Sequence, residues 1–254
     1  MAPLFALPSW MQRRNRRDAP PGSWRPILES NLPVVGKLTE EHQRQLFKHI
    51  KDFLAHKRFE GCGGLAVTEE IQVTIAAQAC MLLLGRKTRT YPKLKTILVY
   101  PHTYQGGRKG LFGGDNGADA RLGESWAVGV VVLAWDSVLG GARNFEDGHN
   151  VAFHEFAHQL DQEDGATDGA PILEERSAYS AWARVFSHEY KDLVDKTRKG
   201  RKSTMDRYGA TNPAEFFAVA TETFFEKPQQ LKTKHPELYE ELQYYYKVDP
   251  IQWT

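Results

Sequence analysis

The chain has 254 residues, of which 41% are hydrophobic and 26% are charged, so it can bury a sizeable core and is not a disordered protein. Its 33 Lys and Arg nearly balance its 32 Asp and Glu, and a net charge of +1 provides no field that would attract nucleic acid or a membrane surface. The two cysteines, Cys62 and Cys80, exclude a disulfide framework, and we interpret them as reduced thiols of a cytoplasmic protein.

The N-terminal segment is rich in Pro and Arg, and we expect residues 1–30 to form a loosely ordered extension. Its apolar residues precede its basic ones, which is the reverse of the order in a secretory signal. No stretch approaches the roughly 18 apolar residues that a membrane span requires. We therefore expect no membrane partner.

Periodicity and capping residues predict helices and a few strands. Thr39 is placed to cap the first long helix, Pro213 suits the first position of a late one, and Gly85 and Gly200 can end others. Together the patterns predict helices over 38–58, 68–84, 147–161, 173–199, 213–226 and 235–247, and strands over 96–101 and 126–135. The glycine-rich segment 106–120 lacks phosphate-loop spacing, and we expect a mobile loop over a cleft.

The stretch VAFHEFAHQLD, residues 151–161, carries two histidines four residues apart. On a helix His154 and His158 share a face one turn apart, so both can aim an imidazole nitrogen at one zinc ion. Glu155 is rotated by about 100° from His154, so it does not join them as a ligand but can reach a water on the metal as general base. The rest of the helix is apolar, and buried polar groups need partners. The pattern favours a zinc site over a polar helix.

The third ligand must come from elsewhere, because the metzincin extension with a third histidine is absent. Glu215 and Glu222 lie seven residues apart on one face of the apolar helix predicted over 213–226. Spacing alone leaves both open as ligands, and it also leaves open that both are exposed. Asp161 is either the acceptor for the second ring N–H of a ligand histidine or a solvated residue at the helix end.

The stretches HEFAHQLD and YGATNPAEFFAVATETFF resemble the Mlc titration factor A family of zinc peptidases. These are gluzincins related to the catalytic domain of anthrax lethal factor, and the resemblance begins near residue 25. It implies an α+β, zincin-like fold that is mostly helical, with a small mixed sheet and an active-site helix. Residues 31–254 would then form a single peptidase domain, with a helical part at 31–90 and a catalytic part at 91–254.

The same resemblance implies the site residues. His154, His158 and Glu215 would bind Zn²⁺, Glu155 would be the catalytic base, and Tyr208 would stabilise the oxyanion. Some family members carry a histidine, proposed to block the zinc, in the loop before the ESW segment. This chain has no histidine between His102 and His149. That route to an autoinhibited resting state is therefore in doubt.

The expected function is hydrolysis of short peptides by an aminopeptidase-like zinc enzyme, and the resemblance also implies binding to Mlc, a transcriptional repressor of sugar uptake genes. The alternative is a regulatory protein-binding module whose zinc site is structural or vestigial. Nucleic-acid binding is disfavoured by the near-zero net charge. Strand 126–135 would pair with extended substrate or be an interior core strand. The sequence leaves the oligomeric state open.

Overall fold

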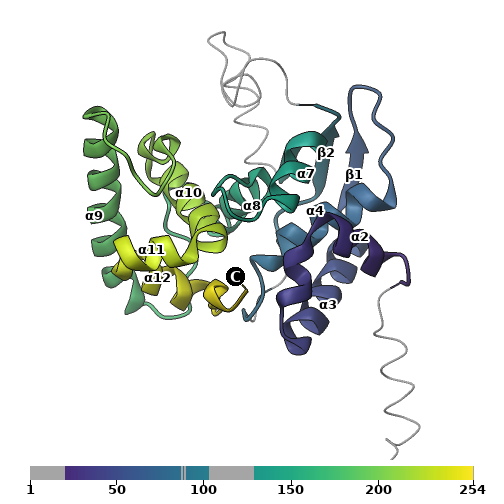
Figure 1. Ribbon diagram of the computed structural model, residues 1–254, viewed down its shortest axis with the longest axis horizontal. Helices are drawn as coiled ribbons and strands as arrows, with labels where there is room; N and C mark the ends of the chain where they lie inside the picture. The colour runs from purple at the N-terminus through teal and green to yellow at the C-terminus, as the bar shows by residue number, and fades with distance from the viewer. Residues whose placement is uncertain (1–20, 87, 89, 103–128, 254) are drawn as a thin grey trace, which may run out of the picture.

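The computed structural model describes residues 21–86, 88, 90–102 and 129–253. The helices gather in two groups with one helix, α8, between them (Figure 1). From Trp24 to Ala134 the chain contains α2 (Trp24–Asn31), η1 (Pro33–Lys37), α3 (Glu40–His56), β1 (Arg58–Gly61), α4 (Glu69–Met81), β2 (Thr96–Tyr100) and β3 (Val130–Ala134). The remainder contains α7 (Trp135–Arg143), α8 (Val151–Asp161), α9 (Ala178–Arg198), η2 (Arg207–Ala210), α10 (Pro213–Glu226), α11 (Pro228–Lys234), α12 (Pro236–Tyr246) and η3 (Pro250–Trp253).

The described strands form one three-stranded sheet in the order β1-β2-β3, and both pairs are parallel. The expected mixed sheet is therefore wrong for the described part of the chain. The connections explain the difference, because parallel neighbours need a crossover of a dozen or more residues. Helix α4 lies in the connection from β1 to β2, and residues 101–129 separate β2 from β3. The mostly helical α+β class is confirmed.

The N-terminal helices begin where the sequence predicts. The Thr39 side chain accepts a hydrogen bond from the His42 backbone N–H, and Thr68 does the same for Ile71, so both cap their helices. Helix α2, however, lies partly within the segment 1–30 that we expected to be loosely ordered. Trp24 in this helix is buried, and its Nε1 donates to Glu69 Oε1 at 3.1 Å, which anchors α2 on α4.

Helix α8 lies between the two groups of helices (Figure 1). Aromatic side chains pack it against both of them. Phe156 packs against Phe53 and Tyr91, with ring centroids 5.7 and 5.1 Å away. Phe153, on another side of the helix, packs against Phe225 of α10 at 5.1 Å. All of these rings are buried, and burying each large ring stabilises the fold by about 2 kcal/mol or more. The core therefore fixes α8 from both sides.

Three further findings concern membrane-spanning helices, the glycine-rich segment and the cysteines. No helix in the described part of the chain combines the length and the apolar character that crossing a bilayer requires. The predicted glycine-rich loop at 106–120, and the position of the loop histidine in family members, lie outside the described residues. Cys62 and Cys80 are both unpaired.

Candidate metal centre

Helix α8 presents His154 and His158 on one face. It begins after Asn150, whose side chain accepts a hydrogen bond from the Phe153 backbone N–H at 3.0 Å. The two imidazole rings lie one turn apart with centroids separated by 4.9 Å, and their Nε2 atoms are 3.3 Å apart. Both rings are buried. The helix therefore brings two nitrogen donors to one point.

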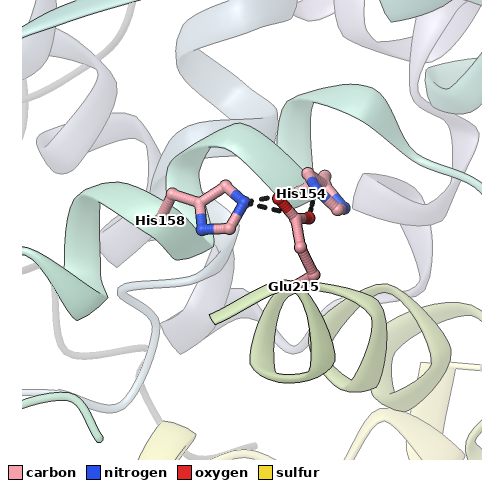
Figure 2. A group of neighbouring side chains, drawn as sticks. All are labelled: His154, His158 and Glu215. Carbon is pink, nitrogen blue, oxygen red and sulfur yellow. Dashed lines mark hydrogen bonds and ion pairs between the residues drawn. The ribbon is translucent and has the colours of Figure 1, made fainter. Parts of the chain in front are cut away.

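Helix α10 brings a carboxylate to the same point. Asn212 caps this helix by accepting from the Glu215 backbone N–H at 2.9 Å, which places Glu215 in the first turn. Figure 2 shows the Glu215 side chain extending from α10 towards both histidines of α8. Its Oε2 lies 2.9 Å from His154 Nε2 and 3.4 Å from His158 Nε2.

These three side chains fit a metal ion. One donor atom of each of His154, His158 and Glu215 lies within 4.8 Å of the others. Around a tetrahedral zinc with bonds near 2.0–2.1 Å, neighbouring ligand atoms are about 3.4 Å apart. The observed separations of 2.9, 3.3 and 3.4 Å require only small movements to reach that spacing. Two imidazoles and one carboxylate are also ligands that zinc prefers.

The electrostatics of the centre favour a cation. Burial alone would lower the pKa of His154, but the carboxylates of Glu222 and Glu215 raise it to about 10. Burial would raise the pKa of Glu215, but its hydrogen bonds with His154 and His158 hold it well below its usual range. The neighbouring carboxylates thus raise the pKa of His154 more than burial lowers it. The two carboxylates therefore favour positive charge at this point, and a divalent metal supplies it.

The structure places the two expected catalytic side chains beside this cluster. Glu155 has only 3% of its surface exposed, and burial, reinforced by the charges of Glu215 and Glu222, raises its pKa. Tyr208 comes from η2, where Asp206 Oδ1 accepts from its backbone N–H at 2.7 Å. Its ring centroid lies 5.8 Å from that of His154. Glu155 therefore lies within reach of the charges of the cluster, and the Tyr208 ring packs beside that of His154.

Glu222 lies on the other side of His154. It is fully buried, so the expectation that it might be exposed is wrong. Its Oε2 is 2.9 Å from His154 Nδ1, and its Oε1 accepts from the Asn150 backbone N–H at 2.8 Å. Helix α10 therefore supplies one carboxylate to each nitrogen of the same imidazole. The spacing of Glu215 and Glu222 placed them on one face but did not distinguish these positions.

Asp161 is buried too, so it is not the solvated residue that one of our two readings expected. Its Oδ2 accepts from the Gly169 backbone N–H at 3.0 Å, while within the described ranges its Oδ1 and His158 Nδ1 have no hydrogen-bond partner. Gly169 has φ +78, and a Cβ there would lie 2.4 Å from Pro213 O. Asp161 therefore ties the end of α8 to a loop that packs on the start of α10.

Glu226, which the sequence analysis did not single out, lies one turn after Glu222 in α10. It is buried, and its Oε2 accepts from the His149 backbone N–H at 3.0 Å. Glu222 and Glu226 thus receive two consecutive backbone N–H groups at the start of α8. The signal in the sequence was an acid four residues after Glu222 at the end of an apolar helix.

Glu226→Gln is expected to make stability less dependent on pH. Burial raises the pKa of Glu226 from 4.5 to about 8. Between these values the folded protein keeps a proton that the unfolded chain releases, so the free energy of unfolding falls as pH rises through this window. Glutamine cannot ionise and its oxygen can still accept from His149. In urea unfolding the variant should match wild type near pH 5 and be more stable at pH 8, by on the order of a few kcal/mol. Equal stability at pH 8 would contradict this assignment.

Comparison with known proteins identifies the family of the chain. A family model described as glucose-regulated metallo-peptidase M90 matches residues 7–247. An uncharacterised protein from Synechocystis sp. is 41% identical over 259 aligned residues, which cover 99% of this chain and 94% of that protein. Mlc titration factor A from Yersinia pestis is 28% identical over 250 residues, covering 95% of this chain and 90% of that protein. The chain therefore belongs to the glucose-regulated metallo-peptidase M90 family, as its resemblance to Mlc titration factor A predicted.

Proposed function

We propose that the protein is a zinc-dependent, aminopeptidase-like enzyme that hydrolyses short peptides. His154, His158 and Glu215 would hold the zinc, and Glu155 would be the general base. The observation that carries the proposal is the convergence of three donor atoms from α8 and α10 beside a buried glutamate. Three protein ligands leave a coordination position open for water or substrate, whereas structural zinc sites have four protein ligands.

The chain's own residues account for the proton transfers. When bound, zinc supplies Lewis-acid polarisation of the scissile carbonyl and makes water a stronger nucleophile at neutral pH. Glu155 accepts a proton from the attacking water as the C–O bond forms, and it passes this proton to the amine as the C–N bond breaks. Burial raises the pKa of Glu155, which moves its basicity towards the working pH.

Tyr208 is proposed to donate a hydrogen bond from its phenol to the developing oxyanion. Its ring lies beside that of His154 and is partly exposed. Tyr208→Phe is expected to keep its zinc and to lower kcat by about 10²-fold, more than it changes KM. Tyr244→Phe, an exposed residue of α12, is the control and should behave as wild type. An unchanged kcat for Tyr208→Phe would contradict the proposed role of Tyr208 in stabilising the oxyanion.

The substrate backbone is proposed to pair with β3. Within the described part of the chain this strand is hydrogen-bonded to β2 on one side only, and it packs against α8. An extended peptide added along such an edge lies next to the centre and is held through main-chain hydrogen bonds. This geometry favours short, extended peptides over folded proteins.

Hydrolysis of a peptide panel tests the proposed function. Zinc-loaded wild type is offered amino-acid and peptide chromogenic substrates, each with a free or an acetylated N-terminus. We expect cleavage of the free forms only, loss of cleavage after chelation, and recovery when zinc is added back. Cleavage of acetylated peptides alone would exclude the aminopeptidase assignment. Zinc binding without cleavage of any substrate would instead favour a regulatory protein with a vestigial site.

A second candidate function is binding of an Mlc-like transcriptional repressor. It rests on the name of the Yersinia relative, Mlc titration factor A. A repressor and a peptidase of this kind would meet in the cytoplasm, where the unpaired Cys62 and Cys80 would stay reduced. Calorimetry with the zinc-loaded protein and purified Mlc tests this: saturable binding supports the second function, and absence of heat at micromolar concentrations contradicts it.

A further inference from the structure

We infer that Glu222 is the positioning residue of the metal centre: it holds His154 through Nδ1, so that Nε2 faces the metal as a lone-pair donor. This inference rests on the proposed metal site. It assigns a role to a side chain that touches neither the metal position nor a substrate. The evidence is the contact of 2.9 Å between Glu222 Oε2 and His154 Nδ1 in a fully buried environment.

The chemistry of the pair determines which nitrogen carries the proton. Glu222 Oε2 lies 2.9 Å from His154 Nδ1, and a carboxylate oxygen at this distance accepts a hydrogen bond when the imidazole carries its proton on Nδ1. In a neutral imidazole the other nitrogen then has a free lone pair, which is the form that binds a metal. Without this partner either nitrogen could be protonated, and one of the two tautomers cannot use Nε2 as a ligand.

The Glu222 carboxylate is itself held in place. Its second oxygen accepts from the backbone N–H of Asn150, the residue that caps α8, at 2.8 Å. The positive end of the α8 dipole lies at this point and stabilises the negative charge. The same helix, α10, carries Glu215 on the opposite side of the imidazole. The orientation of His154 is therefore set from both sides by one helix.

His158 lacks an equivalent arrangement. Its Nδ1 has no hydrogen-bond partner among the residues that the structure describes. Of the two histidines, His154 is therefore the one whose Nδ1 is held by a described side chain, which sets both the orientation of its ring and the nitrogen that carries the proton. Loss of Glu222 should consequently affect the metal centre itself and not only the stability of the fold.

Glu226 provides a matched control for a purely structural role. It is buried on the same helix one turn later, and it too accepts a backbone N–H from the start of α8, at His149. No contact between Glu226 and the imidazole rings is present among the described hydrogen bonds. If Glu222 only fastened α10 to α8, replacing either glutamate would have the same effect on metal binding.

The test compares Glu222→Gln with Glu226→Gln at pH 7. If the glutamine oxygen keeps the bond from Asn150, its NH₂ group faces His154 Nδ1 and favours the tautomer protonated on Nε2. Chelator competition should then show zinc bound about 10–100-fold more weakly by Glu222→Gln. Glu226→Gln should bind zinc as wild type does. The visible spectrum of the cobalt-substituted protein should change in Glu222→Gln alone.

Equal zinc affinity and equal cobalt spectra in the two variants would overturn the inference while leaving the metal site intact. If wild type itself binds no zinc, the proposed function fails first, and the inference fails with it. A second measurement covers a Glu222→Gln variant that does not fold. In zinc-loaded wild type labelled with ¹⁵N-histidine, NMR should show the His154 Nδ1–H proton further downfield than that of His158, because only His154 Nδ1 lies against a carboxylate; equal shifts would overturn the inference.

Discussion

Replacement of Glu155 by glutamine is expected to leave zinc bound and to lower kcat by about 10²–10⁴-fold. Glutamine has nearly the same size, so it can occupy the buried position without a cavity, but it cannot take a proton from water. The donor atoms of His154, His158 and Glu215 are untouched. Zinc content by elemental analysis and kcat on the best substrate of the panel measure the two effects separately.

The control for this experiment is Glu146→Gln, which makes the same change of charge at an exposed position shortly before α8. It should match wild type in both measurements. A Glu155→Gln variant that keeps both its zinc and its turnover would contradict the assignment of the general base. One that loses its zinc would show instead that Glu155 helps to hold the metal.

Replacement of Glu215 by alanine is expected to abolish tight zinc binding and, with it, hydrolysis. The metal would keep only two protein ligands, both on α8, and lose the negative charge that complements it. The variant also frees His154 and His158 from their contacts with this carboxylate, 2.9 and 3.4 Å away. Equilibrium dialysis against zinc should show affinity falling by several orders of magnitude.

Glu237→Ala is the matched control for that change. Glu237 lies in the first turn of α12, as Glu215 does in α10, so both substitutions remove a favourable charge from a helix N-terminus. Glu237 is largely exposed and pairs with the exposed Arg184. The Glu237→Ala variant should bind zinc as wild type does. Tight zinc binding by Glu215→Ala would mean that another residue is the third ligand.

Most of the helical framework follows from local sequence signals. Helix α10 spans Pro213–Glu226, the predicted limits, because Asn212 caps it and Pro213 suits its first position. Thr39 and Thr68 likewise mark the starts of α3 and α4. The two histidines of α8 required only a helix in order to share a face, so this part of the candidate centre was also predictable.

Other elements depend on contacts that the local sequence does not encode. The predicted strand 126–135 gives way to α7 at Trp135, and the apolar run there does not show where the strand ends. Strand β1, with sequence RFEG, has little apolar character and is recruited by pairing with β2. Helix α11, which was not predicted, begins at Pro228 and ends at Lys234, and α12 begins at Pro236.

In the candidate centre, too, some features follow from the local sequence and others depend on long-range contacts. Glu215 and Glu222 were recognisable as acids on one face of an apolar helix, but the choice between them depended on a family resemblance. Their positions on opposite sides of His154 arise from the packing of α10 against α8, which is a long-range contact. The buried Asp161 likewise accepts a hydrogen bond from the backbone of Gly169, which lies outside α8. Spacing within one helix cannot reveal such contacts.

Anomalous diffraction at the zinc edge, from crystals of the wild-type protein, tests the central claim most directly. The account predicts one peak about 2.0–2.1 Å from the Nε2 atoms of His154 and His158 and at a similar distance from a Glu215 carboxylate oxygen. It also predicts a solvent or substrate atom at the fourth position. No peak between α8 and α10 in zinc-soaked crystals, or a peak there with four protein ligands, would contradict a catalytic zinc centre.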